Sequence, residues 1–268
     1  TITGGDSSTL KGFTIRNGDA QHGGGIYILS SNPTITGNTI IKNEAIHMSY
    51  DPSGPGWTPT GGGGGIYIES SSHPVITNNI ITENESGFLG GGIACMKSTP
   101  TITGNTITKN KVSLFGGGGI IVWECTGTFL IQDNIISENK GAGAGVRVYD
   151  SSPTIKGNTI TDNKGNGIYL SDSSSTVSGN TITGNKENHS GAGISISGGS
   201  PTITGNTISN NSSESEGGGI SISRGSPTIT GNTISNNSAA SGGGGIYISH
   251  SSPTIRDNTI SGNRTDGE

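Results

Sequence analysis

The side chains best suited to acid–base chemistry in this sequence are His47, Asp51 and Glu69. An imidazole beside two carboxylates can transfer protons, and clustered carboxylates are what a glycoside hydrolase uses. The three residues fall in or just after residues 44–64, a Gly- and Pro-rich stretch that interrupts a regular sequence. They are the best catalytic candidates, but the chain has no column of acidic side chains around them. We therefore favour a protein that is not an enzyme.

Metal and cofactor sites are not indicated. The other histidines are scattered and lack the spacing of metal ligands. The runs of glycine precede strand-like segments, whereas a phosphate-binding loop opens a helix. We expect no metal and no cofactor. The scattered histidines are His22, His73, His189 and His250.

Composition narrows the classes of protein further. The chain has 268 residues, 49 glycines, 27% hydrophobic and 12% charged residues, and a net charge of −5. A sequence pI near 5.5 without a basic cluster argues against a nucleic-acid partner. No apolar run approaches the ~18 residues of a membrane span. The abundant Ile and Thr favour strands over helices.

A repeat organises the whole chain. The phrase Pro-Thr-Ile-Thr-Gly-Asn-Thr-Ile recurs in ten copies, with Phe13 at the Asn position of the first copy. A second asparagine follows five residues after each first one, and then come a glycine-rich corner and a Gly-Ile-x-Ile strand. The first asparagines are Asn38, Asn79, Asn105, Asn134, Asn158, Asn180, Asn206, Asn232 and Asn258.

Each repeat contains three short segments that alternate apolar and polar residues with period two, which predicts three strands. A strand this short buries its apolar face only when equivalent strands stack ~4.8 Å apart, so the isoleucines should form columns inside a tube. Asparagines stacked on one another can hydrogen-bond from coil to coil. Both asparagine rows flank corners, and the sequence leaves open which of them is interior.

The pattern resembles the right-handed parallel β-helix repeats of the pectin-lyase-like superfamily, especially the short-coil repeats of bacterial and archaeal surface proteins. Residues 12–18 (Gly-Phe-Thr-Ile-Arg-Asn-Gly) and 23–28 (Gly-Gly-Gly-Ile-Tyr-Ile) are similar to a first full coil of that group. The resemblance implies an all-β solenoid of about ten coils with three strands each. It implies no single activity, because the fold carries lyases, hydrolases, epimerases, adhesins and scaffolds.

We expect residues 1–268 to form one domain with a long loop insertion at 44–64 and no capping helix. The chain opens on what reads as the tail of an earlier coil and stops after two strands of the last coil. These complementary edges predict either a segment of a longer surface protein or a rod that stacks head to tail.

The outward positions of the third strand are apolar or aromatic in the first six coils and mostly serine afterwards. An exposed aromatic strip marks an interface, and rings along a groove also suit sugars. Alternatively, the long loop covers the strip and forms a small second core. The candidate interaction surface comprises Tyr27, Trp57, Tyr67, Phe88, Met96, Phe115, Ile121, Trp123, Tyr149 and Tyr169.

Two other outward rows are read as structural. Thr-x-Thr ladders, as near Thr202 and Thr228, also resemble the ice-binding faces of β-helical antifreeze proteins, but Lys156 and Arg256 interrupt one of these faces. A corner row of alternating charges, which includes Lys42 and Glu83, should pair from coil to coil.

The two cysteines, Cys95 and Cys125, are predicted to be free. Cys95 occupies an inward position, and Cys125 lies three residues beyond the equivalent point one coil later. This offset separates the Cα atoms by roughly 10 Å, too far for a disulfide without movement.

These observations favour an extracellular or cell-surface structural or adhesive module, self-associating end to end or binding a surface protein or a polysaccharide through the aromatic strip. The main alternative is a carbohydrate-active enzyme, either a polysaccharide lyase or a hydrolase. Ice binding is a weaker alternative.

Overall fold

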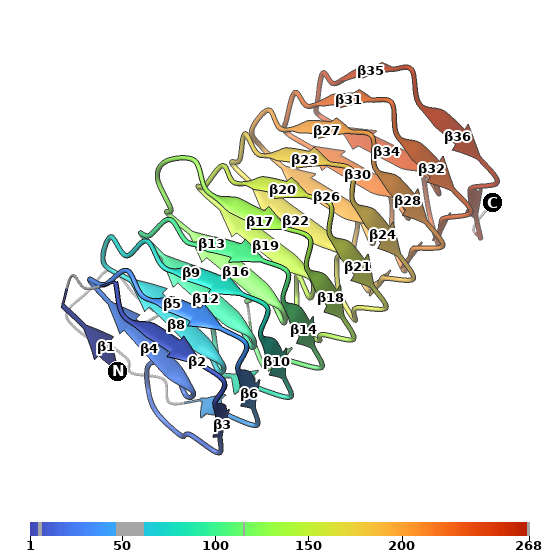
Figure 1. Ribbon diagram of the computed structural model, residues 1–268. Coiled ribbons are helices and arrows are strands. Elements are labelled where there is room, and N and C mark those ends of the chain that lie inside the picture. The colour runs from blue at the N-terminus through green and yellow to red at the C-terminus, as the bar shows by residue number, and fades with distance from the viewer. Residues whose placement is uncertain (5–6, 47–61, 115, 267–268) are drawn as a thin grey trace, which may run out of the picture.

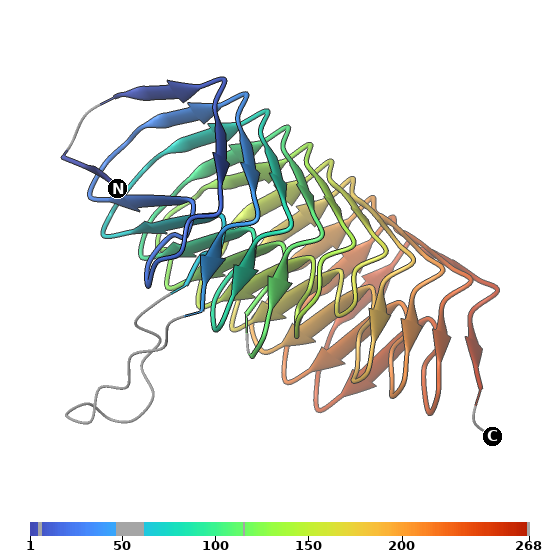
Figure 2. The same ribbon diagram turned by 90° about the horizontal axis from the view of Figure 1, so that it is seen from below.

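The structure is a computed structural model that describes residues 1–4, 7–46, 62–114 and 116–266. In these ranges the chain forms strands and turns and no helix. The strands coil into a parallel β-solenoid of about nine turns with the two termini at opposite ends (Figure 1). Viewed from below, equivalent segments of successive coils lie behind one another (Figure 2). The predicted all-β solenoid with three main strands per coil is confirmed.

The first-strand sheet has ten parallel strands, and all but the two end strands, β2 and β35, present one buried residue between two outward ones. In β13, for example, Ile102 is buried between Thr101 and Thr103. The strands are β2 (Thr9–Lys11), β5 (Thr34–Thr36), β9 (Val75–Thr77), β13 (Thr101–Thr103), β17 (Leu130–Gln132), β20 (Thr154–Lys156), β23 (Thr176–Ser178), β27 (Thr202–Thr204), β31 (Thr228–Thr230) and β35 (Thr254–Arg256).

The second-strand sheet repeats this pattern in ten more parallel strands. They are β3 (Thr14–Arg16), β6 (Thr39–Ile41), β10 (Ile80–Thr82), β14 (Thr106–Thr108), β18 (Ile135–Ser137), β21 (Thr159–Thr161), β24 (Thr181–Thr183), β28 (Thr207–Ser209), β32 (Thr233–Ser235) and β36 (Thr259–Ser261).

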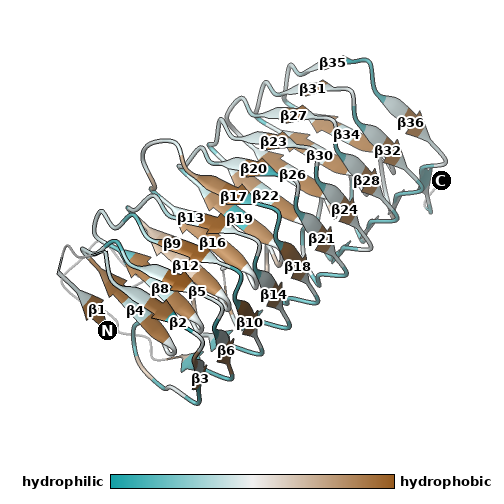
Figure 3. Cartoon of the chain, viewed as in Figure 1, coloured by the Kyte–Doolittle hydropathy of each residue, from teal (hydrophilic) through white to brown (hydrophobic). Residues whose placement is uncertain are grey.

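The third-strand sheet also has ten strands, mostly of four residues, with two residues facing the tube and two facing outward. Figure 3 shows apolar residues recurring along these strands. They are β1 (Ile2–Thr3), β4 (Ile26–Leu29), β8 (Ile66–Glu69), β12 (Ile93–Met96), β16 (Ile120–Trp123), β19 (Val146–Tyr149), β22 (Ile168–Ser171), β26 (Ile194–Ser197), β30 (Ile220–Ser223) and β34 (Ile246–Ser249).

Two-residue strands extend the corner after the second strand into two small parallel sheets. The predicted insertion 44–64 begins in this corner, and its residues 47–61 lie outside the described part. The strands are β7 (Glu44–Ala45), β11 (Glu85–Ser86), β15 (Lys111–Val112), β25 (Lys186–Glu187), β29 (Ser212–Ser213), β33 (Ser238–Ala239) and β37 (Arg264–Thr265).

The tube interior is a single apolar core of stacked aliphatic columns. In the first-strand column, Ile76, Ile102 and Ile131 are paired in register and fully buried. Burial of each such side chain stabilises the fold by ~1.5–3 kcal/mol. Each coil buries its inner face only against the coils above and below it. The apolar core therefore forms only when the strands pair in the correct register.

Both asparagine rows lie inside, which settles the question left by the sequence. Asn79 and Asn84 are each 1% exposed. The Asn79 amide donates to Oδ1 of Asn105 at 3.0 Å, and the Asn84 amide donates to Oδ1 of Asn110 at 2.9 Å. The residue before the first asparagine turns the corner with positive φ, as at Asn78 (55°) and Gly104 (64°). Gly and Asn adopt this left-handed geometry more readily than other residues.

Candidate functional site

The outer face of the third-strand sheet changes character along the rod. One outward column runs from tyrosines through aliphatic residues and an arginine to serines, and a tyrosine returns at β34. The bulky residues are therefore gathered over the early coils, and a polar stretch follows. In order the column is Tyr27, Tyr67, Ala94, Ile121, Arg147, Tyr169, Ser195, Ser221 and Tyr247.

The early half of this face is covered by chain. Leu89, from the loop between β11 and β12, is fully buried against Tyr67, Ala94 and Ile121, and we call these four residues the outer cluster. Tyr67 and Ile121 thus lie outside the tube but are only 2% and 1% exposed. A second small core therefore occupies part of the predicted interaction surface. Partly buried around it are Tyr27, Phe88, Met96, Trp123 and Tyr149.

At one side of the outer cluster, Glu69 accepts hydrogen bonds from two tyrosines. The Tyr67 hydroxyl donates to Glu69 Oε2 at 3.0 Å, and the Tyr27 hydroxyl donates to Oε1. Burial, followed by the Glu69 carboxylate, raises the pKa of Tyr67 well above its ordinary value. Glu69 therefore binds both Tyr27 and Tyr67, whose rings are stacked with their centres 5.6 Å apart. Of the predicted catalytic cluster, His47 and Asp51 lie outside the described residues, as do Trp57 and Phe115 of the predicted surface.

Arg147 ends the apolar half of the face. Its guanidinium lies 4.9 Å from the ring centre of Tyr149 and 4.5 Å from that of Tyr169. Its Nε donates to the Tyr149 hydroxyl at 3.0 Å, and Nη1 donates to the carbonyl of Ala142. Only 8% of Arg147 is exposed, so the cation is held between the rings as part of a wall.

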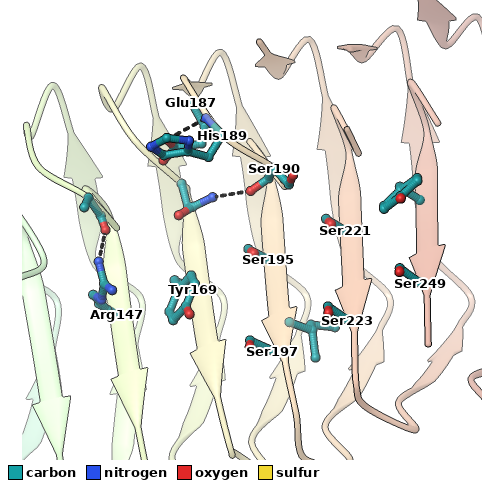
Figure 4. Close-up of a pocket in the computed structure, with 14 residues that line it drawn as sticks. Arg147, Tyr169, Glu187, His189, Ser190, Ser195, Ser197, Ser221, Ser223 and Ser249 are labelled. Carbon is teal, nitrogen blue, oxygen red and sulfur yellow. Dashed lines mark hydrogen bonds between the residues drawn. The ribbon is translucent and has the colours of Figure 1, made fainter. Parts of the chain in front are cut away.

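Beyond this wall lies a groove of about 390 Å³, which we call the serine groove. Tyr169 and Arg147 form one end, and Tyr247 forms the other. Serines of β26 and β30 form the floor between them, and Glu187 at the end of β25, with His189 in the loop that follows, forms the rim (Figure 4). Its floor presents hydroxyl groups from successive coils: Ser195, Ser197, Ser221 and Ser223, with Ser249 beside Tyr247.

The rim is fixed by its own hydrogen bonds. The backbone N–H of His189 donates to Glu187 Oε1 at 3.0 Å, and the Ser190 hydroxyl donates to Glu216 Oε2 at 2.7 Å. Bonds from Ser215 and Ser190 lower the pKa of Glu216. These carboxylates are therefore engaged in shaping the rim of the serine groove.

A column of four lysines runs beside the groove. Lys111, Lys140, Lys164 and Lys186 pair in register on four successive coils, and all four side chains are exposed. They directly follow the second asparagine of each repeat, so the sequence contained a signal that our reading of the corner charges missed. Lys140, Lys164 and Lys186 line a hollow of about 510 Å³ that shares Glu187 and His189 with the serine groove.

A family model described as a right-handed β-helix region matches the chain in three overlapping stretches, residues 1–127, 60–208 and 118–267. Together they span nearly the whole chain. The chain belongs to the right-handed β-helix family. Neither a curated protein nor a solved structure matches it.

The family establishes the fold of this β-helix and leaves its activity open. Among the described residues, no group of three or more His, Cys, Asp or Glu side chains is placed to hold a metal ion. That part of the chain also has no helix of the length and apolarity that crossing a membrane requires. Along the corner row, Lys42 and Glu83 pair at 3.7 Å between exposed side chains, as the alternating charges predict.

The cysteines of the β-helix lie closer together than the sequence analysis predicts. Their Sγ atoms are 3.4 Å apart, and both residues are buried in the tube. The predicted separation was wrong because it continued β16 as a straight strand past Trp123. Glu124 instead has φ of 50°, and this left-handed corner turns Cys125 back into the tube toward Cys95. Both thiols are free in the structure, as predicted.

Proposed function

We propose that this β-helix is a non-catalytic binding module of an extracellular or cell-surface protein, and that it holds a polysaccharide chain in the serine groove. The observation that carries the proposal is the groove itself, with an aromatic ring at each end and hydroxyl groups between them. Sugar rings stack on aromatic faces through their C–H bonds, and their hydroxyls exchange hydrogen bonds with small polar side chains.

The dimensions of the groove support a linear ligand. Tyr169 and Tyr247 are three strands apart in the third-strand sheet, so their Cα atoms are separated by ~14 Å at ~4.8 Å per strand. A short run of sugars can span that distance and contact both rings. The floor between the rings is polar, and a ligand buried there keeps its hydrogen bonds.

The lysine column favours an acidic polysaccharide. Three exposed ammonium groups on successive coils, Lys140, Lys164 and Lys186, attract an anionic chain that follows the rod axis. This contribution is electrostatic and exposed, so binding should weaken as the salt concentration rises.

A glycan array carrying neutral and acidic polysaccharide fragments tests the proposal. We expect the protein to bind acidic glycans, and Tyr247→Ser to lose at least about fivefold in affinity, because truncation of a stacked ring costs more than about 1 kcal/mol of binding free energy. The substitution installs the residue of the neighbouring coils, Ser195 and Ser221, so the fold should persist. Thr207→Ser on the second-strand sheet is the matched control.

Two results would oppose the proposal. Binding that is equal in Tyr247→Ser and the parent protein would place the ligand elsewhere. Unsaturated uronide products, detected by ultraviolet absorbance after incubation with the bound glycans, would favour the enzyme alternative.

A protein partner is the second candidate, and an apolar hollow of about 220 Å³ beside the outer cluster favours it. Phe88, Leu89, Trp123 and Tyr149 line this hollow. An adhesive contact there should weaken in Trp123→Ser and be unaffected by Tyr247→Ser, which separates the two candidates. Head-to-tail association of the rods remains a prediction, and light scattering over a concentration series tests it.

A further inference from the structure

Two columns of side chains in the tube each contain one cysteine, and these are the two cysteines of the chain. Cys95 pairs with Ile68 on one side and Val122 on the other, in a column that is otherwise aliphatic. Cys125 follows the left-handed corner after the third strand, where neighbouring coils carry Ser98 and Ser151. Each cysteine thus replaces a regular residue of its column, and the replacements occur in consecutive coils.

Hydrogen bonds between serines of successive coils explain why the residue after this corner points inward. The N–H of Ser72 donates to Ser98 Oγ at 3.1 Å, and the N–H of Cys125 donates to Ser151 Oγ at 2.9 Å. Cys125 takes the same place, since its thiol donates to the carbonyl of Trp123 at 3.4 Å as the Ser151 hydroxyl donates to that of Tyr149, and it also lies 3.6 Å from the carbonyl of Cys95. The sulfur is therefore held as the serine hydroxyl is, and it is directed at Cys95.

The two sulfurs are in van der Waals contact. The Sγ atoms lie 3.4 Å apart, and the residues are 0% and 1% exposed. A disulfide requires ~2.0 Å between sulfurs, so they need to approach by ~1.4 Å, which side-chain rotations supply within a buried pair. The residues are 30 apart in the sequence, so a bond between them would join two adjacent coils.

We propose that Cys95 and Cys125 are a disulfide-forming pair that closes a covalent link between adjacent coils when the protein folds in the presence of a low-molecular-weight disulfide. The thiolate of one cysteine attacks one sulfur of the small disulfide and releases one small thiol. The sulfur of the other cysteine then displaces the second small thiol from the first. Two S–H bonds and one S–S bond are broken, one protein S–S bond forms, and the two protons leave on the released thiols.

The exchange takes place while the chain folds. The thiolate is the attacking species in this exchange. Both sulfurs are enclosed in the finished tube, so the reaction belongs to folding, before the two coils close.

Refolding tests the proposal. Denatured, reduced protein is refolded either with reduced and oxidised glutathione or with an excess of reductant, and then denatured, alkylated and digested. We expect the first sample to contain a peptide pair linked through Cys95 and Cys125 in a chain two hydrogens lighter. We also expect its denaturant midpoint to exceed that of the reduced sample, because the link restricts the unfolded chain.

The repeat supplies conservative controls. Cys125→Ser restores the serine of neighbouring coils and should fold with the same midpoint in both redox conditions. Adding Val148→Cys to Cys125→Ser places a thiol in the column of Cys95 but two strands away, on β19, and it should not crosslink. Complete alkylation of both cysteines after oxidative refolding to the native circular-dichroism spectrum would overturn the proposal. Crosslinks only between chains, or equal crosslinking of the Val148→Cys control, would overturn it as well.

Discussion

At the scale of single residues, asparagine links the coils at each corner. Asn105 donates through Nδ2 to the carbonyl of Ile76 at 2.8 Å and to Oδ1 of Asn134 at 3.0 Å. Its own Oδ1 accepts from the backbone N–H and the side-chain amide of Asn79. The side chain carries a donor and an acceptor, so identical copies complement one another along the stack. This is why the same residue recurs at both corners.

We predict that Asn105→Ala destabilises the fold more than Asn258→Ala does. The first change removes the acceptor of the buried backbone N–H of Asn79, at a cost of about 1–3 kcal/mol in the free energy of unfolding. Asn258 belongs to the same column but is partly exposed, so water can replace part of what is lost. Urea unfolding of both variants measures the difference. Equal losses would show that the ladder contributes little in the interior.

The buried tyrosine of the outer cluster predicts a dependence on alkaline pH. Because burial and Glu69 raise the pKa of Tyr67, the folded protein holds the phenolic proton more tightly than the unfolded chain. This contribution is complete below the unfolded pKa near 10, and it is lost as the pH rises further, at about 1.4 kcal/mol per pH unit. Tyr67→Phe should reduce the fall in the free energy of unfolding between about pH 10 and about pH 11.5. Unfolding curves at several pH values measure this slope, and identical slopes in parent and variant would contradict the assignment.

At the scale of elements, strand register can be predicted from the sequence, because successive side chains of a strand point alternately into the tube and to the exterior. Ile102 and Tyr169, for instance, lie on the sides that the repeat predicts. Two kinds of feature could not be predicted from the sequence. The inward position of the Cys125 side chain depends on the direction of a corner, and one backbone dihedral angle of Glu124 sets that direction. The burial of Tyr67 depends on where the loop with Leu89 packs, and loops outside the repeat carry no periodic signal. The serine groove is partly predictable. The serines of its floor follow from the repeat, whereas its rim depends on how a loop packs.

The lysine column should lower the stability of the fold. Like charges in register on neighbouring strands repel, and Lys164 has a lysine on each side. We predict that Lys164→Ser, which installs the residue found at Ser212 and Ser238 in the equivalent strands, raises the free energy of unfolding by about 0.5 kcal/mol at low salt. The gain should vanish at high salt.

Lys156→Ser is the matched control for this effect. It removes the same charge from a strand position whose neighbours are Gln132 and Ser178. Thermal or urea unfolding at two salt concentrations compares the variants. A stability gain of the same size in Lys156→Ser would attribute the effect to net charge instead of the column.

At the scale of the whole molecule, the stack makes a rod whose ten-stranded faces extend over ~45 Å. Since each coil contacts only its neighbours, a face can change its character from coil to coil without altering the fold. The third-strand sheet uses this freedom: the outer cluster covers the early coils, and the serine groove opens beyond Arg147. A linear ligand that lies along the rod suits this geometry better than a compact one.

The most direct test of this account is a crystal structure of the protein with an acidic oligosaccharide selected on the glycan array. We expect sugar density in the serine groove, with sugar rings stacked on Tyr169 and Tyr247 and sugar hydroxyls bonded to the serines between them. Density on a different face of the rod, or an empty groove under conditions that saturate binding in solution, would contradict it.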